Sequence, residues 1–153
     1  MSQLHDFGDG LGPVPAHRHL NPDNTIGGWV AETASVADSV RIGFYATVFN
    51  SACVVGNANI KDGAKVYEKA LLNGRVMVAN RAQVKGNAKV FYQSLIKDNA
   101  IVDGDAEIHG ATIDGNLKVR TGYHISRNSV VEANHKLAQV DIDHIMSLDA
   151  QIG

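Results

Sequence analysis

Several features are scarce in this chain of 153 residues, and each scarcity excludes a class of protein. One cysteine, Cys53, rules out an intrachain disulfide, and aromatic residues are 6% of the total, so a core must be mainly aliphatic. A formal net charge of −2 gives no basic footprint for nucleic acid or an anionic membrane. No apolar run reaches the roughly 18 residues of a membrane span. Residues 1–19 lack a signal-peptide pattern. We therefore expect no nucleic-acid or membrane partner.

What the chain does have is a strict period of six residues. Aliphatic residues recur at this spacing without a break from Val30 to Ile108, and the residue two positions earlier is usually Ala or Gly. After Ile108 the register slips by one and resumes through Ile113, Val119, Ile125, Val131 and Leu137. Turn-forming pairs separate the aliphatic positions: Gly56-Asn57, Asp62-Gly63, Gly86-Asn87, Asp98-Asn99 and Gly104-Asp105.

This period predicts an all-β, single-stranded parallel β-helix. An α-helix repeats near 3.6 residues and a flat strand alternates every two, so neither keeps a stripe at every sixth position on one face. Three six-residue sides make a triangular coil of 18 residues, and about six such coils would stack along the chain. We assign residues 1–25 to an extended N-terminal arm, 26–137 to the β-helix and 138–153 to a C-terminal cap or tail.

The segment Val84-Lys85-Gly86-Asn87-Ala88-Lys89-Val90 resembles the hexapeptide-repeat, left-handed parallel β-helix family. The resemblance covers residues 27–137 and implies a left-handed coil. Many members of that family are trimeric acyltransferases, one branch is a zinc carbonic anhydrase, and a phage-associated group without obvious catalytic residues is often labelled transferase. The opening Phe7-Gly8-Asp9-Gly10 and the segment from Gly12 to His19 look most like this last group. Trimeric β-helices are also known as cement or decoration proteins on phage capsids.

The two ends of such a coil need cover, because each exposes unpaired strand edges. We expect Trp29 to act as a lid on the first coil. Residues 1–25 contain all three prolines and show no strand or helix periodicity, so the arm is either disordered or lies on a partner. Its candidate attachment residues are Phe7, Val14, Pro15, His17, Arg18 and His19. Aromatic residues at non-core positions, Phe44, Phe49 and Tyr67, are candidates for a subunit interface.

Candidate chemistry is sparse. The histidine spacings do not match the metal set of the carbonic-anhydrase branch, so we expect no metal site and no cofactor. For acyl transfer, which needs a histidine base beside a subunit cleft, His109 and His135 are the candidates. The long excursion loop or helical domain typical of the acyltransferases is not evident, since the register runs from 30 to 108 without an insertion.

The uninterrupted repeat and the missing acceptor domain therefore favour a structural, non-enzymatic protein, and the resemblance implies a homotrimer. The resemblance implies a decoration or cement protein that binds a major capsid protein, or another large assembly, through its arm. Its location would then be the capsid surface of the virion after synthesis in the host cytoplasm, and otherwise the cytoplasm. Two alternatives stay open: an acyltransferase that uses coenzyme A (CoA), and a scaffold that polymerises end to end.

Overall fold

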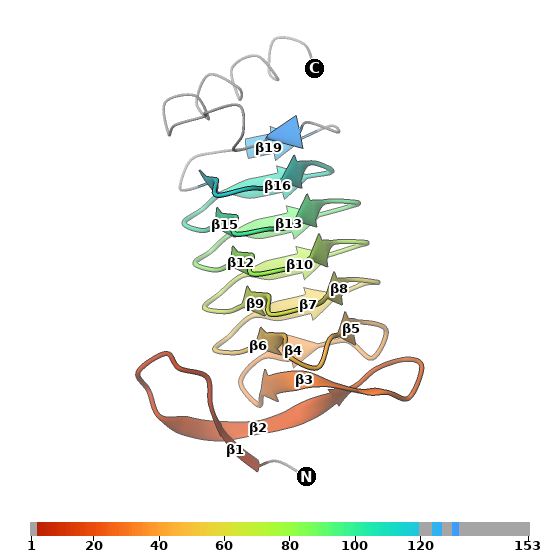
Figure 1. Ribbon diagram of the computed structural model, residues 1–153, viewed down its shortest axis with the longest axis vertical. Helices are drawn as coiled ribbons and strands as arrows, with labels where there is room; N and C mark the ends of the chain where they lie inside the picture. The colour runs from red at the N-terminus through yellow and green to blue at the C-terminus, as the bar shows by residue number, and fades with distance from the viewer. Residues whose placement is uncertain (1–2, 120–123, 127–129, 132–153) are drawn as a thin grey trace.

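The protein is a left-handed parallel β-helix. The six-residue period predicted the parallel coil, and the family resemblance implied its left hand. The computed structural model describes residues 3–119, 124–126 and 130–131. Within them the chain makes about five turns, against the six coils expected, and contains no helix (Figure 1). The predicted tail 138–153 lies outside the described residues.

Three parallel walls form the coil, and each contains six strands stacked in register. Wall A comprises β3 (Ile26–Ala31), β6 (Thr47–Val48), β9 (Lys65–Val66), β12 (Gln83–Val84), β15 (Ile101–Val102) and β18 (Lys118–Val119). Wall B comprises β4 (Ser35–Val36), β7 (Cys53–Val55), β10 (Leu71–Asn73), β13 (Lys89–Phe91), β16 (Glu107–His109) and β19 (His124–Ser126). Wall C comprises β5 (Arg41–Ile42), β8 (Asn59–Ile60), β11 (Met77–Val78), β14 (Leu95–Ile96), β17 (Thr112–Ile113) and β20 (Val130–Val131).

The aliphatic residues of the period fill the interior of the coil. Val48, Val66, Val84 and Val102 are paired strand to strand on wall A, and each is fully buried. Burial of one such side chain contributes about 1.5–3 kcal/mol before chain entropy offsets it. Between positions 30 and 119, Val36 on the first strand of wall B is the exception, because it stays partly exposed.

Backbone with positive φ turns the chain at stacked corners. Between walls B and C these positions are Gly56, Gly74, Tyr92 and Gly110. Between walls C and A they are Asp62, Asn80, Asp98 and Gly115. The side chains of the first three form a ladder, because Asn80 N donates to Asp62 Oδ2, Asp98 N to Asn80 Oδ1 and Gly115 N to Asp98 Oδ2. Asn and Asp tolerate this conformation well, and Gly adopts it without steric cost. Tyr92 departs from this pattern, as does Glu68 at the corner between walls A and B, whose φ is 58°.

The slip after Ile108 shortens one corner by a residue. Thr112 pairs with Leu95, 17 positions earlier, where the regular coils pair residues 18 apart. Ser94 accommodates the change, since its buried hydroxyl donates to Phe91 O and accepts from Gly110 N at 2.8 Å. The slip is therefore a corner adjustment that leaves the walls in register.

The N-terminal residues depart from the expectation of an arm without strands. β1 (Gln3–Asp6) and β2 (Pro13–Leu20) are antiparallel strands, and β2 pairs with β3 at the foot of wall A (Figure 1). The expectation that this arm is disordered or lies on a partner is thus wrong for the described residues from Gln3 onward, which pair with their own chain. Pro13 and Pro15 misled it, because proline is rare within paired strands.

Candidate functional site

Exposed apolar side chains gather at the N-terminal end, by which we mean β1–β3, their connecting loops and the turn at Phe44 and Tyr45. Six of the seven large hydrophobic residues that are exposed in the described part of the chain lie here, and the seventh is Tyr92. The six are Leu4, Leu11, Leu20, Ile26, Phe44 and Tyr45. A concentration of exposed apolar side chains at one end of a molecule is typical of a contact surface rather than of a reaction pocket.

A stack of aromatic rings fastens β1 to the outer face of wall A. Phe7 stacks on Phe49 and Phe49 stacks on Tyr67, each at 4.7 Å between ring centroids. Phe7 and Phe49 are therefore buried within their own chain, at 7% and 3% exposure, and the prediction of an exposed contact role for them is wrong. Tyr67 donates its hydroxyl to Gln83 Oε1 at 2.7 Å, and burial raises the pKa of this hydroxyl.

Arg18 and Trp29 form a second cluster on the same face. The Arg18 guanidinium lies 4.0 Å from the Phe44 ring centre and 4.9 Å from that of Trp29, and it donates to the carbonyls of Gly27 and Phe44. His5 stacks on Trp29 at 4.5 Å, and burial, reinforced by the Arg18 charge, lowers the pKa of His5. Trp29 thus packs on the outer face of β3. It does not close the end of the coil, which was the role that the sequence predicted for it.

The other predicted attachment residues of β2 divide between the surface and the cap. Pro15 is exposed, and Val14 packs beside the Phe7 cluster. His17 pairs through Nδ1 with the Glu32 carboxylate. His19 is buried and donates from Nε2 to Val40 O at 2.6 Å, so it belongs to the cap and not to an exposed surface.

Asn21, which the sequence analysis missed, covers the open edge of β5, the first strand of wall C. Its Oδ1 accepts from Ile42 N at 2.8 Å and its Nδ2 donates to Ile42 O at 3.1 Å. The side-chain amide therefore takes the place of a neighbouring strand. The dipeptide Asn21-Pro22 carried a turn signal, but no periodicity indicated that its amide reaches a residue 21 positions away.

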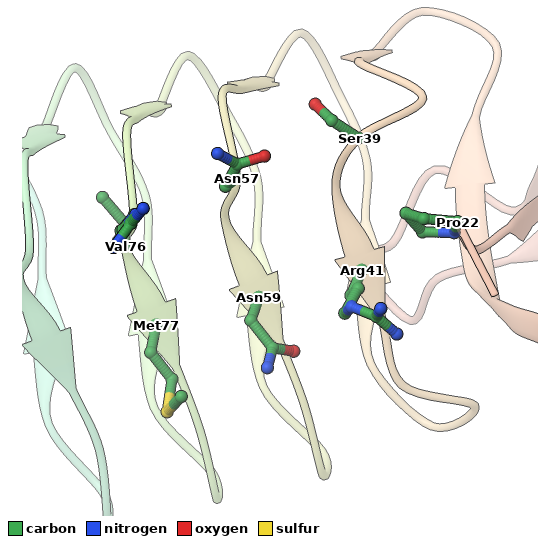
Figure 2. Close-up of a pocket in the computed structure, with 8 residues that line it drawn as sticks. Pro22, Ser39, Arg41, Asn57, Asn59, Val76 and Met77 are labelled. Carbon is green, nitrogen blue, oxygen red and sulfur yellow. The ribbon is translucent and has the colours of Figure 1, made fainter.

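A groove with both polar and apolar lining lies beside wall C (Figure 2). Figure 2 shows Arg41, Asn59 and Met77 on the successive strands β5, β8 and β11, with Ser39 and Asn57 on the neighbouring turns. The groove has a volume of about 570 Å³, and Pro22, Arg75 and Val76 complete its lining. Arg41 is paired with Asp23 at 3.2 Å. The lining contains no histidine, cysteine or carboxylate, so no side chain of the lining is a usual base that could activate the Ser39 hydroxyl, which donates to Gly56 O.

His109, the described candidate for a catalytic base, lies on the outer face of wall B. Its Nε2 is 3.0 Å from Glu107 Oε1, and its ring lies beside Phe91 and Tyr92. His135 lies outside the described residues. In the described part of the chain, no three potential ligands from His, Cys, Asp and Glu converge on one point. Nor does that part contain a helix of the length and apolarity needed to span a bilayer.

Comparison of the chain with protein-family models, curated proteins and solved structures found no match to any of the three. The coil and its N-terminal end therefore carry the functional interpretation by themselves.

Proposed function

We propose that the protein is a structural, non-enzymatic β-helix that forms a homotrimer and attaches to a larger assembly through its N-terminal end. The carrying observation is the segregation of exposed apolar side chains. Of the seven in the part of the chain that the structure describes, six lie at the N-terminal end, whereas the described repeat walls present mainly polar and charged side chains to solvent. A surface that stays apolar at one end of a rod suits attachment at that end.

The sequence resemblance to hexapeptide-repeat β-helices supplies the finer part of the proposal. Under it the assembly is a bacteriophage capsid, the partner is the major capsid protein, and the protein works as a decoration or cement protein on the virion. Three copies on one axis present three attachment ends, and linked contacts of this kind raise the overall affinity without any new contact.

Paired charge substitutions test the attachment surface. Deletion of residues 1–25 is unsuitable because it uncovers the wall A edge that β2 occupies. Leu11→Glu and Tyr45→Glu change side chains that are 70% and 80% exposed, and Tyr92→Glu, at 67%, is the matched control on the far coils. We expect the first two variants to lose co-sedimentation with capsids of the encoding phage, while the control retains it. Equal retention by all three variants would refute attachment through this end.

Sedimentation velocity tests the trimer separately. The expected particle has three times the 16.3 kDa mass of the chain. A monomer across the micromolar range would contradict the trimer and leave the attachment surface to be judged by the capsid assay.

The His109–Glu107 pair favours one second candidate, a CoA-dependent acyltransferase. A carboxylate 3.0 Å from an imidazole nitrogen is the arrangement that orients a general base. This candidate requires saturable CoA binding and acyl transfer that is lost in His109→Ala. Calorimetry without a CoA signal would remove it.

A further inference from the structure

In a parallel ladder, alternate residues turn both their N–H and their C=O toward the following coil, and the residues between them turn theirs toward the preceding coil. In the first coil this second set of groups faces the N-terminal end. On wall B, Ser35 N donates to Ala52 O at 2.9 Å and Ala37 N to Val54 O at 3.0 Å. On wall C, Arg41 N donates to Ala58 O and Gly43 N to Ile60 O. The acceptor carbonyls just named have equivalents one coil earlier in the chain. These are the carbonyls of Ala34 and Val36 on wall B, and those of Val40 and Ile42 on wall C.

Two of the three walls have these groups covered. β2 pairs with β3 and closes wall A. On wall C, His19 donates to Val40 O, and the Asn21 amide serves both the N–H and the C=O of Ile42. The molecule therefore satisfies its end groups on two walls by two different means, a strand and a pair of side chains.

Wall B has no such cover among the described residues. β4 pairs with β7, and it is the terminal strand of its sheet there. On wall C, the N–H and C=O of Ile42 and the C=O of Val40 face away from β8. The equivalent groups on wall B are the N–H and C=O of Val36 and the C=O of Ala34, and they face away from β7. The Val36 side chain is also partly exposed, along with Ala34 and Ala37. Backbone groups and apolar side chains are thus presented together at one strand edge.

Charge indicates what kind of strand this edge accepts. Residues 1–44 contain five acidic residues and two arginines, whereas residues 45–100 contain eight basic and three acidic residues. Glu32 and Asp38, both exposed, flank β4. Two copies that met at their N-terminal ends would bring like charges together, which costs free energy. A segment with Lys or Arg beside its pairing residues would instead meet opposite charge.

We propose that the β4 edge is a strand-addition site for an extended, basic segment of a protein partner. The incoming strand would donate N–H groups to Ala34 O and Val36 O, accept from Val36 N, and cover Val36 with an apolar side chain, which is the usual logic of strand addition. That the segment belongs to the capsid or other large assembly rests on the proposed function; the edge itself follows from the hydrogen-bond geometry.

Amide hydrogen exchange on the full chain tests the site with a built-in control. In the protein alone, the Val36 amide should exchange at least tenfold faster than the Ile42 amide, which Asn21 protects. Addition of the peptide acetyl-Lys-Val-Lys-Val-Lys-amide should slow exchange at Val36 and leave Ile42 unchanged. The same peptide with Glu in place of Lys should have a smaller effect. Equal exchange of the two amides, or no slowing by the basic peptide, would overturn the proposal.

Two lysine substitutions separate the edge from the end as a whole. Val36→Lys places a charge at the inward position of the edge strand, and Ser35→Lys adds the same charge at an exposed position of that strand. We expect Val36→Lys to lose peptide binding and Ser35→Lys to retain it. If both variants bind peptide, the edge is not the site, whereas capsid attachment through Leu11 and Tyr45 is still decided by its own assay. If both variants lose peptide binding, hydrogen exchange at Val36 in the wild-type chain decides whether the β4 edge is the site.

Discussion

The regular coils and the N-terminal end of this molecule follow different rules. In the coils each residue packs on equivalents 18 positions away, so Val66 has Val48 on one side and Val84 on the other. At the N-terminal end the equivalent below is missing, and the chain replaces it with an antiparallel strand, an asparagine amide and a histidine. The comparison teaches that a repeat supplies its own partners everywhere except at its ends, where the solutions are particular to each wall.

The largest expected effect comes from a charge placed in the middle of the repeat. Val66→Asp buries a carboxylate at a fully buried position without a partner, and we expect a loss of more than about 4 kcal/mol of stability. Val36→Asp is the matched change at the partly exposed first coil, where water reaches the carboxylate, and it should cost far less. Chemical denaturation followed by circular dichroism measures both. Equal losses would mean that the first coil is as closed as the middle.

Loss of the Asn21 amide should have the next largest effect. Asn21→Ala leaves the N–H and C=O of Ile42 without partners, at about 1–3 kcal/mol for each group. Asn57→Ala removes an exposed amide and should be nearly neutral. Denaturation midpoints give the energies, and faster exchange of the Ile42 amide identifies the cause. Unchanged exchange at Ile42 would show that another group covers wall C.

Acid should loosen the N-terminal end before it affects the coils. The pKa of His5 in the folded protein lies below its ordinary value of 6.5, chiefly because of burial and then because of Arg18. The unfolded chain therefore binds the proton more readily, so the stability of β1 falls as the pH drops below 6.5 and recovers as the pH rises. Trp29 is the sole tryptophan and stacks on His5, so its fluorescence reports this region. His5→Phe keeps a ring there and should abolish the pH response.

The smallest expected effect is a gain in stability at a corner. Tyr92 has a φ of 63°, and the residues stacked with it at the same corner, Gly74 and Gly110, are glycines. Tyr92→Gly should relieve strain of about 1 kcal/mol, partly offset by the greater freedom of glycine when unfolded. A rise of a few degrees or less in the melting temperature is expected. Gly86→Tyr, the reverse change at another corner, should destabilise, since a Cβ there would lie 2.7 Å from Gly104 N.

The sequence predicted the regular coils better than the N-terminal end, because only the coils repeat. The aliphatic period predicted the core, and the Gly, Asn and Asp pairs predicted corners such as Gly56, Asp62 and Gly104, all of which have positive φ. Gly28 shows the limit of that pattern. It occupies a position that alanine fills in other coils, yet a Cβ there would lie 1.8 Å from Ala46 O, so only glycine fits.

The predicted contact residues show the same limit. Phe49 and Tyr67 lie 18 positions apart, so their stacking follows the period of the coil, but Phe7, 42 positions earlier than Phe49, covers the stack and buries Phe49. No period links a strand that folds back antiparallel with the wall it covers. No period links Asn21 with Ile42 either, or Arg18 with the Trp29 and Phe44 rings between which it lies.

By itself the sequence determined the coil, because each inward residue needs only its neighbours at a fixed separation, and that separation can be read along the chain. The tertiary structure alone decided which walls are closed at the N-terminal end and which strand edge is left open. Those outcomes depend on where a non-repeating segment meets the first coil in space, and on the direction in which unpaired backbone groups point there.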